Sequence, residues 1–83
     1  MRIDLVLKYL CLAKSRSIAK SLCDEGRVSI NGSAARAAAT VHPGDRVRVR
    51  FAERALEIEL LEVPAKQASK PDAPRFYRIL SEG

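Results

Sequence analysis

The side chains best suited to chemistry in this sequence are cations around the start of a predicted helix. Lys14, Ser15 and Arg16 lie at the beginning of a segment with helical periodicity, and Lys20 follows one turn later. The Ser15 hydroxyl is suited to accept a hydrogen bond from a backbone N–H group of that first turn. Unpaired N–H groups and the positive end of the helix favour an anion there. Because arginine can bind a phosphate through two N–H groups, the pattern predicts a phosphate-binding surface.

Residues for catalysis or metal binding form no comparable pattern. His42 is the only histidine in the sequence. Cys11 and Cys23 lie in apolar segments, where we expect them to be reduced and packed as small hydrophobic residues. We find no glycine-rich phosphate loop and no nucleophile beside a base. We therefore expect no catalytic residue, no metal, no cofactor and no enzymatic activity.

The positive charge is concentrated in the N-terminal part of the chain. Residues 1–50 carry ten basic and four acidic side chains, whereas residues 51–83 carry five basic and six acidic ones. A basic half beside a neutral half indicates a polyanionic partner, which can be a nucleic acid or an anionic membrane surface. No apolar run approaches the ~20 residues that span a bilayer. We therefore expect a cytoplasmic protein without a membrane partner.

Helical periodicity appears in two segments near the N-terminus. In residues 3–12 the apolar face comprises Ile3, Leu7 and Leu10, with Val6 beside them. Asp4 suits the first turn, and we expect it to pair with Lys8 four residues later. In residues 15–25 the apolar stripe comprises Ile18, Ala19, Leu22 and Cys23. Gly26 is expected to end this second helix.

After Gly26 the apolar residues recur at every second position, which is typical of strands. The predicted strands are 28–30, a short one at the end of an irregular segment 33–41, 46–51, 57–63 with a bulge or strand end at Leu60-Leu61, and an edge strand 75–80. Asn31-Gly32 and 42–45 are predicted turns, and 64–74 is a predicted exposed loop. The order of elements predicts an α+β fold, with two short helices packed on a small, mainly antiparallel sheet.

Arg46, Arg48 and Arg50 alternate with apolar residues in one predicted strand, so all three should share one face of the sheet. Two interpretations remain open for them. The three arginines can extend an RNA-binding surface, or they can protect an edge strand against aggregation.

Several motifs together resemble the S4-type RNA-binding domain family. They are Arg2-x-Asp4, Leu10-x-Leu12, Lys14-Ser15-Arg16-Ser17-x-Ala19, Gly26-Arg27-Val28-x-Ile30-Asn31-Gly32 and Pro43-Gly44-Asp45-x-Val47-x-Val49. The resemblance implies an S4-type module in residues 1–51, and we expect residues 52–83 to complete the same domain. A chain of this size is similar to the stand-alone S4 proteins of ribosome quality control, which are relatives of the small heat-shock S4 protein.

That resemblance implies binding to structured rRNA and tRNA, on large ribosomal subunits that carry peptidyl-tRNA. The RNA-binding candidates are Arg2, Lys8, Lys14, Ser15, Arg16, Lys20, Arg27, Asn31 and Arg36. We expect the free protein to be a monomer. Tyr9, Phe51, Phe76 and Tyr77 are expected in the core or at its rim rather than as platforms for stacked bases.

Two alternatives remain. Two short helices before a hairpin also suit a DNA-binding helix-turn-helix protein, whose second helix reads base edges in the major groove. The outer face of the second predicted helix offers Arg16, Lys20 and Asp24, which suit phosphates better than bases. The other alternative is a general RNA-binding S4 module that acts in another step of ribosome assembly or translation.

Overall fold

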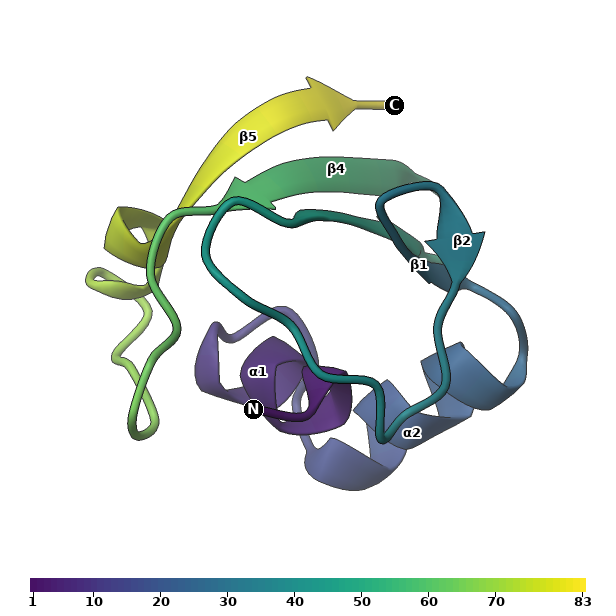
Figure 1. Cartoon of the computed structure of the whole chain (residues 1–83), viewed down its shortest axis with the longest axis horizontal. Coiled ribbons are helices and arrows are strands. Elements are labelled where there is room, and N and C mark those ends of the chain that lie inside the picture. Colours follow the sequence, from purple (N-terminus) through teal and green to yellow (C-terminus); the bar gives the residue numbers. More distant parts are fainter.

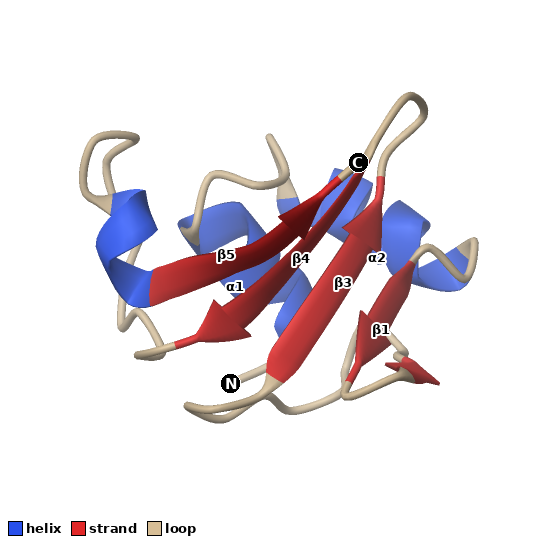
Figure 2. Cartoon of the chain, turned by 90° about the horizontal axis from the view of Figure 1, so that it is seen from above, coloured by secondary structure: helices blue, strands red, loops and turns tan.

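Two helices lie against one face of a five-stranded antiparallel sheet, as Figure 1 shows with the helices below the strands. The computed structural model describes all 83 residues. The elements are α1 (Ile3–Tyr9), α2 (Arg16–Asp24), β1 (Val28–Ile30), β2 (Ser33–Ala34), β3 (Arg46–Arg50), β4 (Ala55–Leu60), the short 3-10 helix η1 (Ala73–Phe76) and β5 (Tyr77–Glu82). The strand order is β2-β1-β3-β4-β5, and every pairing is antiparallel. The predicted α+β class is therefore confirmed, and Figure 2 looks onto the sheet face that the helices leave uncovered.

Helix α2 begins and ends where the sequence predicts. The Ser15 hydroxyl accepts the Ile18 backbone N–H at 3.1 Å, which satisfies one of the free donors of the first turn. At the other end Gly26 takes a φ of +73°. The N–H groups of Gly26 and Arg27 then donate back to the carbonyls of Cys23 and Leu22, the two bonds of a Schellman ending.

Helix α1 ends at Tyr9, three residues before the predicted end at residue 12. The chain stops in the same way as α2, because the N–H groups of Cys11 and Leu12 donate to the carbonyls of Lys8 and Leu7. Cys11 takes the left-handed position with a φ of +61°. Glycine usually marks this position, so no residue type in this segment indicated the helix end.

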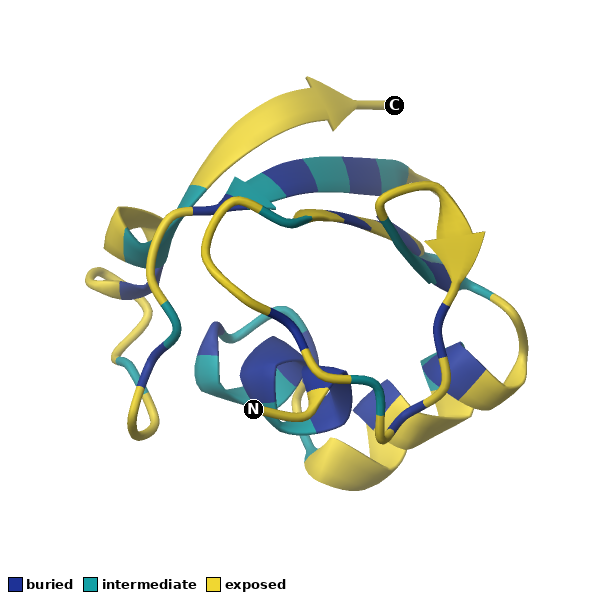
Figure 3. Cartoon of the chain, viewed as in Figure 1, coloured by how far each residue is buried: buried dark blue, intermediate teal, exposed yellow.

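The predicted buried stripe of α2 is narrower than expected. Ala19 and Cys23 are buried, but Ile18 is 46 % exposed, so the prediction that Ile18 is buried was wrong. Figure 3 shows the outer side of α2 as exposed along most of its length. Helix α1 lies over the sheet. Helix α2 packs mainly against α1, through the side that carries Ala19 and Cys23.

The hairpin between β1 and β2 follows from Asn31-Gly32. Their φ angles are +51° and +86°, as a two-residue turn that matches the strand twist requires. Ile30 pairs with Ser33 across it. The short strand of segment 33–41 therefore lies at its beginning and not at its end, although Thr40 makes a single bridge to Arg2.

Strand β3 alternates as predicted, with Val47 and Val49 buried between exposed arginines. It is the central strand of the sheet, paired with β1 on one side and β4 on the other. The hypothesis that its arginines protect an edge was therefore wrong. The edge of the sheet on the C-terminal side is β5, which pairs with β4 alone.

The C-terminal strands are displaced by a few residues from their predicted positions. Strand β4 begins at Ala55 and ends at Leu60, and burial changes abruptly from fully buried Leu60 to Leu61, which is 48 % exposed. Helix η1 occupies 73–76, so β5 starts at Tyr77. The loop 61–72 is less exposed than predicted, because Pro64 is buried in it.

One core joins both parts of the chain. Leu56, Ile58 and Leu60 of β4 pack in the same apolar cluster as Ile3 and Leu7 of α1. Figure 3 shows buried stretches on both the sheet and the helices. Because α1 is fixed on this core, its N-terminal side chains have a rigid support.

Candidate RNA-binding surface

A buried carboxylate holds two arginine side chains where both helices begin. Arg2 donates through Nε and Nη2 to the two carboxylate oxygens of Asp4, at 3.2 and 3.1 Å. Arg16 donates through Nε to Asp4 Oδ2 at 3.2 Å. The Asp4 side chain is 2 % exposed, whereas those of Arg2 and Arg16 are 46 % and 49 % exposed. We call Arg2, Asp4 and Arg16 the Asp4 cluster.

The Asp4 cluster leaves guanidinium N–H groups available to another acceptor. A guanidinium has five N–H donors, of which Arg2 uses Nε and one on Nη2, and Arg16 uses only Nε. The Asp4 carboxylate also accepts the Leu5 backbone N–H at 2.8 Å. The carboxylate is thus fully used inside the protein, while two fixed cations keep a net positive charge at the surface.

Asp4 does not pair with Lys8, so this prediction was wrong. The Lys8 Nζ donates instead to Gln67 Oε1 at 2.9 Å. The four-residue spacing would allow the pair on a solvated helix, but the Asp4 carboxylate is directed toward the start of α2. The role of Asp4 was missed in the sequence, although Arg2-x-Asp4 is a visible motif.

Only one of the two helix starts has free backbone donors. At α1 the N–H groups of Ile3 and Asp4 donate to the carbonyls of Ala39 and Ala37. At α2 the Ser15 hydroxyl takes the Ile18 N–H, and the first turn contains no acidic residue. The N–H groups of Arg16 and Ser17 have no intrahelical acceptor. The start of α2 therefore offers an anion both backbone donors and the Arg16 guanidinium.

Lys20 and Arg27 form ion pairs along α2. Lys20 pairs with Asp24 and Arg27 with Glu25, each at 3.3 Å, and all four side chains are at least partly exposed. Such solvated pairs are weak and open easily to a phosphate. Arg27 follows the C-terminal end of α2, which is about 13 Å from its start by helix geometry. It therefore lies away from the Asp4 cluster.

The Asn31 side chain forms hydrogen bonds within the protein. Its amide donates to Asp45 Oδ1 at 3.1 Å, and its Oδ1 accepts the Arg46 backbone N–H at 2.9 Å. The hydrogen bonds from the His42 backbone N–H and from Asn31 lower the pKa of Asp45 below its usual value. Asn31 thus joins two turns, and none of its side-chain hydrogen bonds goes to the Asp4 cluster.

The remaining predicted residues lie around the two helices. Arg36 is exposed on the segment whose carbonyls receive the α1 N–H groups, so its backbone lies beside the Asp4 cluster. Lys14 lies in the α1–α2 connection and lines one hollow together with Lys8. The structure thus brings Arg2 and Arg16 into direct contact with one carboxylate and places Ser15, Lys14 and Arg36 near them. The side chains of Arg27 and Asn31 form their hydrogen bonds with other residues.

Figure 2 shows the face of the sheet that the helices leave uncovered. The three exposed arginines of β3 lie on that face, because they alternate with the buried valines. Their neighbours on β4 include acids, because Arg46 lies opposite Glu59 and Arg48 opposite Glu57. Glu59 also pairs with Arg78 of β5. This face therefore carries mixed charge and is separated from the Asp4 cluster by the sheet.

Comparison with known proteins identifies the family of this chain. The model of the S4 domain family matches residues 1–47, more than half of the chain. The chain belongs to the S4 domain family. The match ends within β3 and so covers the helices, the hairpin and all residues of the Asp4 cluster.

Relatives of this S4 protein match it over nearly its full length. The RQC P-site tRNA stabilizing factor of Bacillus subtilis is 40 % identical over 82 residues, covering 99 % of this chain and 94 % of the relative. The factor of the same name from Halalkalibacterium halodurans is 34 % identical, covering 99 % and 92 %. The trimeric structure of Vibrio cholerae heat shock protein 15 superposes with a TM-score of 0.91 at 25 % identity, over 98 % of this chain and 82 % of that one. The predicted resemblance to stand-alone quality-control S4 proteins is confirmed, and the helix-turn-helix alternative is not favoured.

Proposed function

We propose that this S4 protein binds structured rRNA and tRNA on the large ribosomal subunit and stabilises peptidyl-tRNA during ribosome-associated quality control. The observation that carries the proposal is the Asp4 cluster, in which a buried carboxylate fixes two half-exposed guanidinium groups beside the free start of α2. Full-length relatives named RQC P-site tRNA stabilizing factor support the choice of tRNA and ribosome as partners.

The Asp4 cluster suits the backbone of folded RNA better than single bases. Fixed guanidinium groups match phosphate oxygens, and they need no rearrangement when the phosphate arrives. Double-stranded RNA is recognised mostly through phosphates and 2′-hydroxyl groups, because its deep groove hides the bases. We therefore infer recognition of shape, with strong salt dependence and little dependence on sequence.

Binding without chemistry is sufficient for this role, so we infer that the protein is not an enzyme. We infer a cytoplasmic location from its ribosomal partners. Separately, none of the helices has the length and apolar character of a transmembrane span. We propose that residues 1–51 make the principal RNA contacts, that residues 52–83 complete the domain, and that the free protein is a monomer. The candidate contacts remain those proposed from the sequence, with Arg2 and Arg16 as the leading pair.

Co-sedimentation with purified large subunits tests the proposal. Subunits that carry peptidyl-tRNA should retain more protein than subunits without tRNA. Arg16→Ala should weaken binding by about 10-fold or more, since a hydrogen bond to a charged group contributes about 1.5–3 kcal/mol. Arg75→Ala removes an arginine that is 82 % exposed in the C-terminal part, and serves as the matched control. Equal loss in both variants would contradict the assigned surface, and equal retention on both subunits would contradict the quality-control role.

A further inference from the structure

We propose that Lys8, Lys14 and Lys70 form a second phosphate-binding site, which takes a backbone phosphate of the same RNA that the Asp4 cluster binds. The three lysines line one hollow between the C-terminal end of α1 and the loop 61–72. This inference rests on the proposed RNA-binding function and extends it to the C-terminal part of the chain, where Lys70 lies outside the segment that the S4 family model matches.

No carboxylate compensates the charge of the hollow. None of the residues that line it is acidic. Lys14 and Lys70 take part in none of the ion pairs, and Lys8 donates only to the neutral Gln67 amide oxygen. Three ammonium groups around one hollow repel each other, and a bound anion would remove that repulsion.

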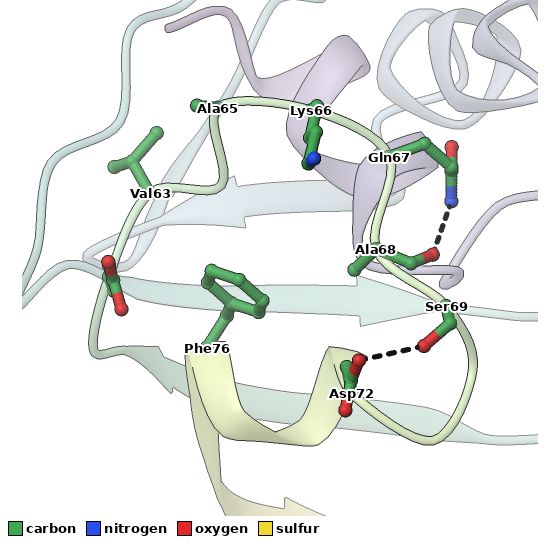
Figure 4. Close-up of a pocket in the computed structure, with 9 residues that line it drawn as sticks. Val63, Ala65, Lys66, Gln67, Ala68, Ser69, Asp72 and Phe76 are labelled. Atoms are coloured by element: carbon green, nitrogen blue, oxygen red, sulfur yellow. Dashed lines mark hydrogen bonds between the residues drawn. The ribbon is translucent and has the colours of Figure 1, made fainter.

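The wall that carries Lys70 is fastened to α1. The Gln67 amide nitrogen donates to the Tyr9 carbonyl at 3.3 Å and to the Ala68 carbonyl at 3.0 Å, the second of which Figure 4 shows. The Ala68 N–H also donates to the Tyr9 carbonyl, and the Cys11 thiol donates to the Ala68 carbonyl at 3.3 Å. The loop therefore holds its position beside α1, so the hollow is present before a ligand binds.

The acidic residues of this loop lie in a different hollow. Glu62 and Asp72 line the pocket drawn in Figure 4, where Asp72 accepts a hydrogen bond from Ser69 at 3.1 Å. Lys66 also lines that pocket, and its side chain is directed toward the side on which Phe76 lies. The loop thus presents a mixed surface on one side and an uncompensated cationic one on the other.

The position of Lys14 favours RNA as the ligand of this hollow. Lys14 lies two residues before Arg16, so it joins the lysine hollow to the start of α2. An RNA backbone offers phosphates at regular intervals, and one strand can reach both places. Lysine suits this contact because its ammonium group acts as a mobile point charge.

Binding of purified tRNA at several salt concentrations tests the inference. Lys70→Gln should weaken binding about 8-fold at 0.1 M salt and lower the slope of log affinity against log salt by about 0.9, as loss of one phosphate contact predicts. Lys66→Gln makes the same change in charge four residues away, and should leave both quantities nearly unchanged.

The outcomes separate this inference from the proposed function. If Arg16→Ala weakens binding while Lys70→Gln behaves like Lys66→Gln, the lysine hollow is not an RNA site and the proposed function stands. If the unmodified protein does not bind tRNA or large subunits, both fail. A Lys70-dependent affinity for a polyglutamate peptide, with tRNA binding unaffected by Lys70→Gln, would overturn the choice of RNA as ligand.

Discussion

Replacing Asp4 by asparagine separates geometry from net charge as the basis of RNA binding. The substitution keeps the size of the side chain and removes one negative charge beside two arginines. If charge alone governed the affinity, the more positive variant would bind RNA more tightly. We expect weaker binding, because Asp4 Oδ1 and Oδ2 hold Arg2 with two hydrogen bonds and Arg16 with one.

The magnitude follows from these contacts. Arranging each released arginine when RNA binds costs about 0.5–1.5 kcal/mol, which gives about 1–3 kcal/mol for the pair. Removing a negative charge about 8 Å from a phosphate gains about 0.5 kcal/mol in water before salt screening. The difference of about 0.5–2.5 kcal/mol corresponds to binding weaker by about 2- to 60-fold. Asp4→Asn should also lower the free energy of unfolding by about 1–2 kcal/mol, since both arginines are half exposed and solvent weakens the pairs.

The assay is tRNA binding at 0.1 M salt and at a temperature where urea titration shows that each variant is folded. Asp24→Asn is the matched control, because it removes the same charge from an exposed pair with Lys20 on α2. We expect Asp24→Asn to bind tRNA as tightly as the unmodified protein or slightly more tightly. Tighter binding by both variants would refute the argument that Asp4 positions the arginines.

Three further predictions concern stability. Ser15→Ala should lower the free energy of unfolding by about 1 kcal/mol through loss of the hydrogen bond from the Ile18 N–H; an unchanged urea midpoint would mean that the cap is absent in solution. The pKa of Asp45 is lowered by its hydrogen bonds from the His42 N–H and Asn31, so its contribution to stability is present above the usual carboxyl pKa of about 3.9 and is lost as pH falls through the lower folded value. The Asp45→Asn variant lacks this contribution to stability. The difference in unfolding free energy between this variant and the unmodified protein should therefore shrink between pH 6 and pH 3. A constant difference would contradict the lowered pKa of Asp45. Leu60→Ala should cost about 2–5 kcal/mol, because Leu60 is fully buried, and a shift in thermal midpoint of less than a few degrees would contradict its place in the core.

Local signals in the sequence predicted most of the elements. Ser15 and Gly26 delimit α2, and Asn31-Gly32 forms the hairpin turn, because each acts on backbone groups within a few residues. The end of α1 could not be predicted in this way. Cys11 occupies a left-handed position that glycine normally marks, and tertiary contacts with the loop 61–72 hold it there.

The sequence predicted which cations belong to the candidate site, but it did not predict how they are arranged. Arg2 and Arg16 were identified from motifs, whereas their shared bond to Asp4 joins residues up to twelve positions apart. Lys70 was missed for the same reason, since only the folded loop brings it to the same hollow as Lys8. Strand order likewise depends on long-range pairing, which is why β3 was not recognised as the central strand.

Sedimentation of the tagged protein from cell lysate on a sucrose gradient tests the central claim most directly. We predict migration with large ribosomal subunits, in fractions that also contain peptidyl-tRNA, and loss of that migration in Arg16→Ala but not in Arg75→Ala. Confinement of the unmodified protein to the ribosome-free fractions, while the purified protein still binds tRNA, would contradict the role in ribosome quality control.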